Sequence, residues 1–446
     1  MLRPVPGPAV GRPAGPVAAR MRERMERLQP LHRSLTGDGV RESLAVLGES
    51  VPLRVRTVPS GARVFDWTVP EEWSVRAAYV ADGSGRRVVD VAEHPLHLVG
   101  YSTPVRARLG LDELRPHLHS LPEQPDVVPF RTSYYTRDWG FCLRHRDLLA
   151  LAPGEYDVVV DTTLAPGELT YGEVVVPATG VGPGGRAGQA EVLVTSHVCH
   201  PAMANDNLTG LTVAVELAAH VAALPQRRHA YRFLFAPGTL GVLAWLARNP
   251  DLVPRVRHAL VLTGLGGGGP LVYKQTRHGD RGIDRAVRHV VGRRGGEVRA
   301  YSPWGYDERQ LNAVGFGVPA GRLTRTPHGE YPEYHTSADD LAFVGDDELV
   351  DALEALTEVV DVLEHDAAYT NLAPYGEPQL GPRGLYPATG GRSADEEVMA
   401  MLWTLGYSDG ATSLLAIAET AGLPFATVRA AAARLAAAGL LAERSR

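Results

Sequence analysis

From residue 189 onward, short apolar runs of strand length alternate with longer runs of helical character. The strand-like runs are Glu191–Ser196, Tyr231–Phe235 and Ala259–Thr263, and the helical runs between them are Leu211–Leu224 and Gly241–Ala247. Because parallel strands need a crossover connection, usually a helix, this alternation predicts a mostly parallel sheet with helices on both faces. Ligands bind beyond the carboxyl ends of such strands, so polar residues at those ends are the first candidates for a site.

Other parts of the chain depart from this α/β pattern. Short β-branched and aromatic runs separated by Gly, Pro and Asp indicate a mostly β module before residue 177, and residues 370–391 are rich in Pro and Gly. Three helical segments follow. We therefore predict a disordered leader (1–15), a discontinuous α/β domain (16–66 and 177–375), an inserted β domain (67–176), a linker (376–392) and a winged-helix-like domain (393–446).

Composition restricts the environment and the partners of the chain. No run of about 18 apolar residues occurs, and prolines interrupt the N-terminal stretch, so the sequence predicts neither a membrane span nor a signal peptide. The only cysteines, Cys142 and Cys199, favour a reducing, cytoplasmic setting. The net charge of -6 argues against a nucleic-acid-binding surface, which needs clustered basic residues.

The strongest chemical signal is the segment TSHVCHPAMANDNLTG, Thr195 to Gly210, between a buried strand and a helix. It brings His197, Cys199, His200 and Asp206 into one polar turn at the carboxyl end of the strand. Imidazole, thiol and carboxylate groups are the ligands that zinc prefers. A His-x-x-His spacing alone is equally compatible with loop capping and turn formation.

Two further polar clusters fall in separate turns of the same domain. EYHTSADDL, Glu333 to Leu341, contains His335, and GYDERQLNAVGFGVPAG, Gly305 to Gly321, contains Asp307 and Glu308. Three such clusters in one α/β domain favour a metal or catalytic site at one edge of the sheet.

The order of these motifs resembles the zinc aminopeptidase and glutaminyl cyclase superfamily. The shared pattern is a strand ending in His, then Ala-Asn-Asp-Asn-Leu-Thr-Gly, an Asp-containing turn followed by Gly-Phe-Gly-Val-Pro, and Tyr-His-Thr-Ser-x-Asp. This resemblance implies that His197, Asp206 and His335 bind zinc. It also implies that Asp307 is a buried supporting carboxylate.

A closer resemblance, from about residue 16 to the end, is to bacterial aminopeptidase-like proteins with an inserted β domain and a C-terminal winged helix. The segments that carry it are FDWTVPEEW (Phe65–Trp73), PFRTSYYTRDWGFC (Pro129–Cys142), SHVCHPAMANDN and RTPHGEYPEYHTSADD (Arg325–Asp340). We therefore expect an aminopeptidase-like fold with these two added domains.

The chain departs from the superfamily where two carboxylates are expected. Peptidases of the superfamily place a general base and a metal ligand in succession, and the winged-helix family has Pro-Glu-Thr-Ile-Gly, whereas this chain has APGTLG. Gly238 thus occupies the position of the general base and Thr239 that of the ligand. The aspartate that a second zinc would need at the end of the strand Ala259–Thr263 is also missing, because that strand continues into Gly264. We expect one zinc ion at most.

Other residues are candidates for the missing proton acceptor. Glu308 or Glu333 can reach the site from another loop, and Cys199 can supply a thiolate. We favour Glu308, assisted by Asp307, although a surface ion pair with Arg309 or Arg325 explains Glu308 equally well.

Substrate contacts are predicted from the residues that flank these motifs. His200, Cys199 and Glu333 lie in the polar turns, and Arg131 is suited to bidentate binding of a carboxylate. Tyr135 belongs to an aromatic run that lines either a substrate cleft or the core of the inserted domain.

The last segment has the helix, turn and helix order of a winged-helix module. Its charge balance argues against DNA binding and favours a protein partner or self-association. The acidic and basic residues from 393 to 446 are Asp395, Glu396, Glu397, Asp409, Glu419 and Glu443, against Arg429, Arg434, Arg444 and Arg446.

Three functions remain open from the sequence. The first is a zinc-dependent hydrolase acting on an amide bond of a peptide-like or aminoacyl small molecule. The second is an acyl-transfer or cyclising enzyme, in which zinc polarises a carbonyl. The third is a catalytically inactive aminopeptidase fold kept as a binding or regulatory protein, which the residues Gly238, Thr239 and Gly264 support.

Overall fold

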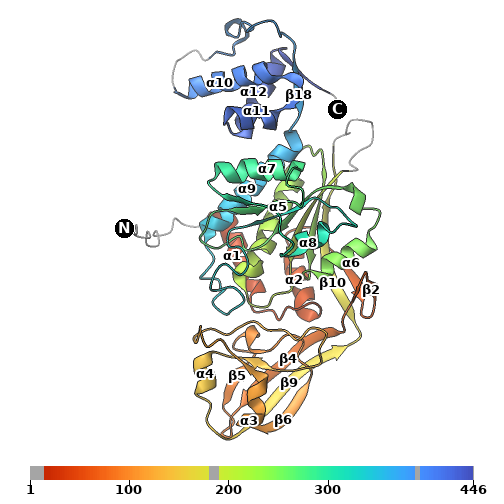
Figure 1. Cartoon of the computed structure of the whole chain (residues 1–446), viewed down its shortest axis with the longest axis vertical. Helices are drawn as coiled ribbons and strands as arrows, with labels where there is room; N and C mark the ends of the chain where they lie inside the picture. Colours follow the sequence, from red (N-terminus) through yellow and green to blue (C-terminus); the bar gives the residue numbers. More distant parts are fainter. Residues whose placement is uncertain (1–14, 180–189, 387–391, 445–446) are drawn as a thin grey trace.

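The protein is elongated, with three parts stacked along its longest axis (Figure 1). A computed structural model describes residues 15–179, 190–386 and 392–444. Residues 1–14 of the predicted leader and residues 387–391 of the predicted linker lie outside these ranges. In the described part of the chain, each helix is too short or too polar to cross a membrane.

An eight-stranded sheet forms the central part. Its four inner strands, β12, β11, β13 and β16, are parallel, whereas β1, β10 and β14 pair antiparallel with their inner neighbours. In spatial order the strands are β1 (Arg54–Pro59), β10 (Glu168–Val176), β12 (Ala230–Ala236), β11 (Glu191–His197), β13 (Val256–Leu262), β16 (Ala320–Thr324), β14 (Val272–Lys274) and β15 (Glu297–Arg299). The predicted α/β fold class is confirmed.

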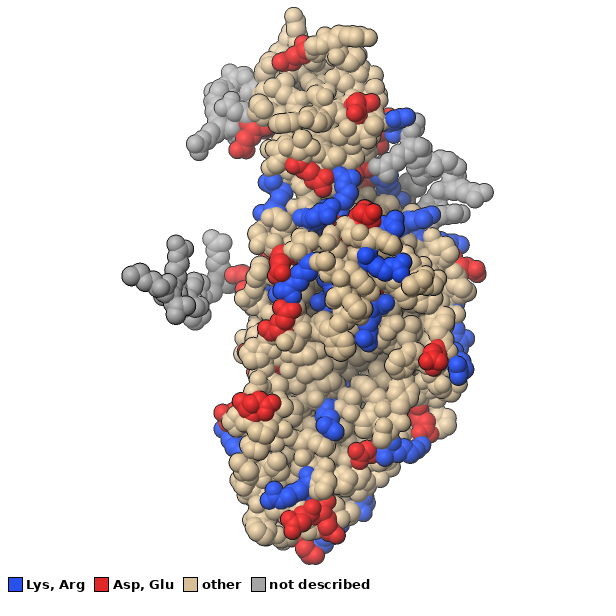
Figure 2. Space-filling model, viewed as in Figure 1, with Lys and Arg blue, Asp and Glu red and all other residues tan. Residues whose placement is uncertain are grey.

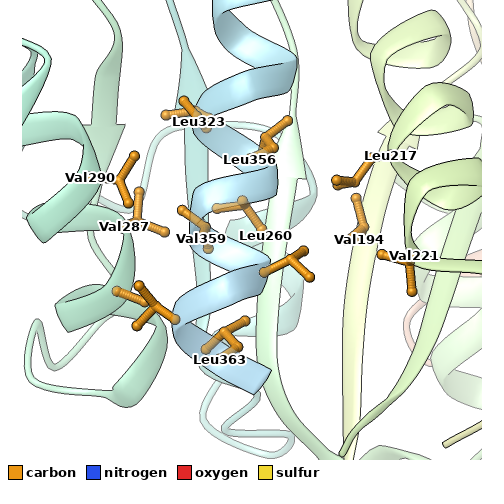
Figure 3. Close-up of a cluster of buried hydrophobic side chains, with 14 of the residues drawn as sticks. Val194, Leu217, Val221, Leu260, Val287, Val290, Leu323, Leu356, Val359 and Leu363 are labelled. Carbon is orange, nitrogen blue, oxygen red and sulfur yellow. The ribbon is translucent and has the colours of Figure 1, made fainter. Parts of the chain in front are cut away.

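Helices cover both faces of this sheet because its strands are apolar on both sides. Along β11, Val192 and Val194 point into one core and Leu193 into the other. Figure 3 shows Val194 and Leu260 of the sheet packed with Leu217 and Val359 of the covering helices. The first face carries α1 (Pro16–Leu28), α2 (Asp38–Gly48), α5 (Thr209–Ala223), α7 (Gly282–Arg293) and α9 (Asp346–His365), and the second carries α6 (Leu240–Arg248) and α8 (Asp307–Leu311).

A four-stranded antiparallel sheet, β5-β4-β9-β6, forms the lower part of Figure 1 around its own core, which includes Trp73 and Phe141. β10 lies within the residues predicted for this β domain, yet it belongs to the large sheet. The β-domain elements are β4 (Glu72–Ala81), β5 (Arg87–Asp90), β6 (Val105–Gly110), β9 (Glu155–Ala165), α3 (Leu111–Leu114), α4 (His145–Leu149) and two-residue strands β7 (Leu118–His119) and β8 (Phe141–Cys142). A hairpin of β2 (Arg63–Val64) and β3 (Trp67–Thr68) lies at its entrance.

The C-terminal part contains three helices, α10 (Arg392–Tyr407), α11 (Leu414–Ala421) and α12 (Phe425–Ala437). They accompany a small antiparallel sheet of β17 (Ala368–Asn371), β18 (Asp409–Ser413) and β19 (Leu441–Glu443). β17 follows α9 directly, so this sheet begins before the predicted linker. Contacts of α12 with α9, including the pair of Arg429 with Asp361, fix the module against the central domain.

Candidate functional site

The loop after β11 carries three side chains whose ligand atoms meet. His197 is the last residue of β11, and Asp206 lies in the turn Ala204–Leu208, where its own backbone is not helical, just before α5. Nε2 of His197 lies 2.8 Å from Oδ1 of Asp206 and 3.1 Å from Nδ1 of His200. Ligand atoms of these three residues all lie within 4.8 Å of one another, as they would around one metal ion.

His335 reaches the same carboxylate from the loop before α9. Its Nε2 lies 3.2 Å from Oδ2 of Asp206. The backbone of His335 has a φ of 57°, a conformation that is uncommon for a residue with a side chain. The N–H of Phe130, from the β domain, donates to the His335 carbonyl oxygen at 2.8 Å. The inserted domain therefore helps to fix His335.

Phe130 also packs against the histidines themselves. Its ring centroid lies 5.3 Å from that of His200 and 5.1 Å from that of His335, both edge to face. Phe130 was not among the residues predicted for the site, although the segment that contains it contributed to the family resemblance. An aromatic ring here covers the histidines from the side of the β domain.

Asp206 is the electrostatic centre of the group. Burial alone would raise its pKa, but the charges and hydrogen bonds of His200 and His197 hold the pKa of Asp206 well below its usual range. Its backbone N–H donates to Oδ2 of Asp339 at 3.0 Å. Burial and the charge of Asp206 raise the pKa of Asp339 to about 7. Asp206 is therefore ionised, as a metal ligand must be.

Two tyrosines that the sequence analysis did not select complete the cluster. The Tyr306 hydroxyl donates to Oδ2 of Asp206 at 2.8 Å and lies 3.1 Å from the Tyr334 hydroxyl. Tyr306 stacks on His197 with a centroid distance of 4.6 Å, and Tyr334 stacks on His335 at 3.9 Å. Both tyrosines directly precede a selected residue, Asp307 or His335, and that adjacency was the available signal.

The positions of the missing carboxylates border this cluster. An added Cβ at Gly238 would lie 3.0 Å from Cβ of His197 and 3.7 Å from Oδ1 of Asp307. The Thr239 hydroxyl accepts a hydrogen bond from Gln310 at 3.1 Å. Gly264 offers no side chain, so this side of the cluster carries no carboxylate at those positions.

Asp307 and Glu308, adjacent in sequence, have opposite environments. Glu308 is fully buried and paired with Lys274 at 2.9 Å and with Arg322 at 3.5 Å. Neither oxygen of Asp307, also buried, has a hydrogen-bond partner among the described residues. Burial, aided by the charge of Glu308, raises the pKa of Asp307 to about 7. Glu308 is thus a buried ion-pair partner, not the surface residue of the alternative interpretation.

Cys199 and Glu333 lie near the site without joining its ligand group. The Cys199 thiol accepts a hydrogen bond from the Gly238 N–H at 3.2 Å, and burial raises its pKa to about 12. A thiol in this environment is not a ready thiolate. The Glu333 side chain forms no hydrogen bond or ion pair with the part of the chain that the structure describes, and its carbonyl accepts from Thr336.

The structure does not bring Arg131 and Tyr135 to the histidines. Arg131 is exposed, and the Tyr135 ring is 54% exposed. The Tyr135 hydroxyl donates to the Thr68 carbonyl at 3.2 Å, and its ring lies 6.0 Å from that of Trp67. Tyr135 therefore packs at the hairpin of β2 and β3.

The donors present fit a zinc ion. His197, His200 and His335 offer imidazole nitrogens around one ionised carboxylate, which is a nitrogen and oxygen set typical of zinc. Asp339 and Tyr306 bind and orient Asp206 from behind, as partners of metal ligands commonly do.

This fold and its loop-borne cluster define an aminopeptidase-like α/β protein with a C-terminal winged helix. The chain belongs to the family described as "Domain of unknown function (DUF4910)", which matches residues 22–366. A winged helix-turn-helix family matches residues 367–443.

Similar proteins agree with this class. A Clostridium acetobutylicum protein is 42% identical over 413 residues, covers 92% of each chain, and is described as "Putative polysaccharide biosynthesis protein with aminopeptidase-like domain". The crystal structure of a "putative peptidase" from Clostridium acetobutylicum has a TM-score of 0.89 at 39% identity, covering 96% of each chain.

A zinc aminopeptidase from Bacillus subtilis, BSAP, shares the fold at greater distance. Its structure has a TM-score of 0.57 at 14% identity, covering 79% of this chain and 96% of that chain. This likeness concerns the fold, and the predicted resemblance to zinc aminopeptidases is confirmed at that level.

Proposed function

We propose that this protein is a zinc-dependent enzyme that acts at the amide carbonyl of a peptide-like or aminoacyl small molecule. The convergence of His197, His200, Asp206 and His335 at the carboxyl end of the parallel strands carries this proposal. The aminopeptidase-like fold supports it. A single ion is proposed, because Thr239 and Gly264 replace carboxylates that a second ion would need.

In this proposal the metal ligands and the aromatic residues around them have distinct tasks. Asp206 and the three histidines hold the zinc, and Phe130 and the tyrosines keep their rings in place. When bound, zinc supplies a Lewis acid that polarises the substrate carbonyl. The Tyr306 hydroxyl donates its proton to Asp206, which leaves the Tyr334 hydroxyl, 3.1 Å away, able to orient a polar group of the substrate.

Hydrolysis is the first candidate reaction, and amide-forming cyclisation is the second. Cyclisation is favoured by one observation, which is that Gly238 provides no carboxylate where peptidases keep their base. In both reactions a nucleophile attacks the polarised carbonyl, but only hydrolysis consumes water.

Zinc analysis and product mass test the proposal together. We expect about one zinc per chain and turnover of aminoacyl 4-nitroanilides or N-terminal glutaminyl peptides that a chelator abolishes and zinc restores. A mass gain of water marks hydrolysis, and a loss of ammonia marks cyclisation. Zinc-loaded protein that turns over neither substrate class would favour the inactive binding module instead.

For the winged helix we propose a protein contact, either with a partner or with a second copy. Both arginines of α12 are ion-paired within the chain, Arg429 with Asp361 and Arg434 with Glu397. The visible face of this domain in Figure 2 carries scattered charges without a continuous basic stripe. Light scattering and duplex-DNA titration of the full chain test this, and salt-sensitive micromolar DNA binding would contradict it.

A further inference from the structure

We infer that Asp307 is the proton-transfer residue that takes the place of the glutamate missing at position 238. Its Oδ1 lies 3.7 Å from the point where the first side-chain atom of residue 238 would begin. The same point is 3.5 Å from Cγ of His197, so Asp307 and the histidine cluster both lie beside position 238. This inference rests on the proposed function, because it assigns the base of that reaction.

The bonding state of Asp307 supports this role. Its side chain is 1% exposed, and neither oxygen has a partner at ordinary hydrogen-bond geometry among the residues described, although the Thr195 hydroxyl acts on it and lowers its pKa. A buried, unpartnered carboxylate costs free energy, since burial of a polar group is offset only by hydrogen bonds. A catalytic role is one physical reason for a native fold to keep such a polar group unpartnered.

Neighbouring acidic and thiol groups are less suited to the task. The pairs with Lys274 and Arg322, and the Tyr306 N–H at 3.0 Å, occupy the Glu308 carboxylate. Cys199 is held by the Gly238 backbone. Burial raises the pKa of Asp307 most, followed by the charge of Glu308, and the Thr195 hydroxyl and the charge of Arg309 lower it.

The proton balance is the same for both candidate reactions. In hydrolysis, water attacks the carbonyl carbon, a C–O bond forms, and Asp307 accepts the water proton. The C–N bond then breaks, and Asp307 returns that proton to the departing amine. In cyclisation the substrate amine attacks the carbonyl carbon of the carboxamide, a new C–N bond forms, and Asp307 accepts the amine proton. The C–N bond to the carboxamide nitrogen then breaks, and Asp307 returns the proton to departing ammonia.

The variant Asp307→Asn tests the assignment in zinc-loaded protein. We expect kcat/KM to fall by about 10²–10⁴-fold, the usual contribution of general acid–base catalysis, with one zinc per chain retained. Asp284→Asn is the matched control, because Asp284 is a buried carboxylate that binds Tyr273 and Thr276 at the start of α7. It should lower stability and leave kcat/KM and zinc content unchanged.

Rescue separates proton transfer from positioning. Added to Asp307→Asn, Gly238→Glu should recover at least about tenfold of the lost kcat/KM. Gly238→Ala should recover none, although its Cβ crowds His197 equally. If Asp307→Asn does not fold, the pH–rate profile of the parent tests the assignment instead. We expect its acid limb to have its midpoint near pH 7, because burial raises the pKa of Asp307 to about 7.

The outcomes distinguish the two proposals. Full turnover in Asp307→Asn, or a parent profile flat between about pH 6 and 8, overturns the role of Asp307 and leaves the zinc enzyme intact. If Asp307→Asn loses both its zinc and its turnover, the proton-transfer role of Asp307 is also overturned, because Asp307 would then support the metal site. Absence of zinc-dependent turnover in the parent overturns the proposed function itself.

Discussion

The two sides of the cluster differ in what they offer a metal. On the donor-rich side, His197, His200 and Asp206 follow β11, and His335 joins them, so that each ligand atom faces another. On the donor-poor side, the turns after β12 and β13 present Gly238, Thr239 and Gly264. A loop can therefore have the backbone position expected for the fold without carrying the expected metal-binding side chains, because different residues determine the backbone geometry and the side-chain function.

The largest effect should follow removal of a donor-rich ligand. His197→Ala and Asp206→Ala should each weaken zinc binding by more than about 100-fold, because even changes to the partners of metal ligands cost 10- to 100-fold. Competition with a chromophoric chelator measures this. If either variant binds zinc as tightly as the parent, the replaced residue is not a ligand, and the donor-rich side does not hold the metal as proposed. His289→Ala, on α7, is the control with unchanged affinity.

The next effect concerns the ion pair that borders the donor-poor side. Glu308→Gln leaves the buried Lys274 ammonium without its carboxylate, and breaking such a pair costs about 3–5 kcal/mol. Urea unfolding of the metal-free protein measures the loss. A change below about 1 kcal/mol would show that water or the Trp304 carbonyl, which also accepts a hydrogen bond from Lys274, compensates, and Glu308 would again be available as a base.

Asp307→Asn should flatten the pH dependence of stability. The pKa of Asp307 is about 7 in the folded protein and about 3.8 unfolded, so its contribution is fully present below about pH 4 and is lost as pH rises through 7. The stability of the variant relative to the parent should rise over that window, by on the order of 4 kcal/mol at most, since one pKa unit is about 1.4 kcal/mol.

Urea unfolding of metal-free protein at a series of pH values measures this difference. Asp284→Asn is the control for a change at a buried carboxylate, whose oxygens accept hydrogen bonds from the backbone of Thr276 and Arg281. Equal pH dependence in parent and Asp307→Asn would mean that an unseen partner keeps Asp307 ionised.

The sequence predicted most of the α/β architecture because apolar periodicity follows directly from burial. The strand Glu191–Ser196 and the helix Leu211–Leu224 correspond to β11 and α5 within two residues at each end. Neither β10 nor β17 could be assigned to its sheet, since pairing partners are distant in sequence and a short strand fits several sheets.

For the site, the order of the motifs predicted His197, Asp206 and His335 as metal ligands, but it did not show the different environments of the residues around them. Asp307 and Glu308 are adjacent carboxylates in the sequence, and only the fold shows that Lys274 pairs with one of them. Phe130 was missed because its contact with His335 crosses two domains. Long-range contacts of this kind leave no local pattern.

The smallest effect should come from Thr239, the residue at the position of the lost ligand. Its hydroxyl is bonded to Gln310 at 3.1 Å and has no contact with the histidines among the residues described. Thr239→Ala should therefore leave zinc affinity within about twofold and cost about 1 kcal/mol of stability for the lost hydrogen bond. Thr239→Glu is the informative counterpart, because a carboxylate there restores a ligand type of the superfamily. If Thr239→Glu alone takes up a second zinc, the donor-poor side lacks only a ligand side chain. If Thr239→Ala lowers the zinc affinity tenfold, Thr239 is itself a ligand, and the two sides of the cluster do not differ as described.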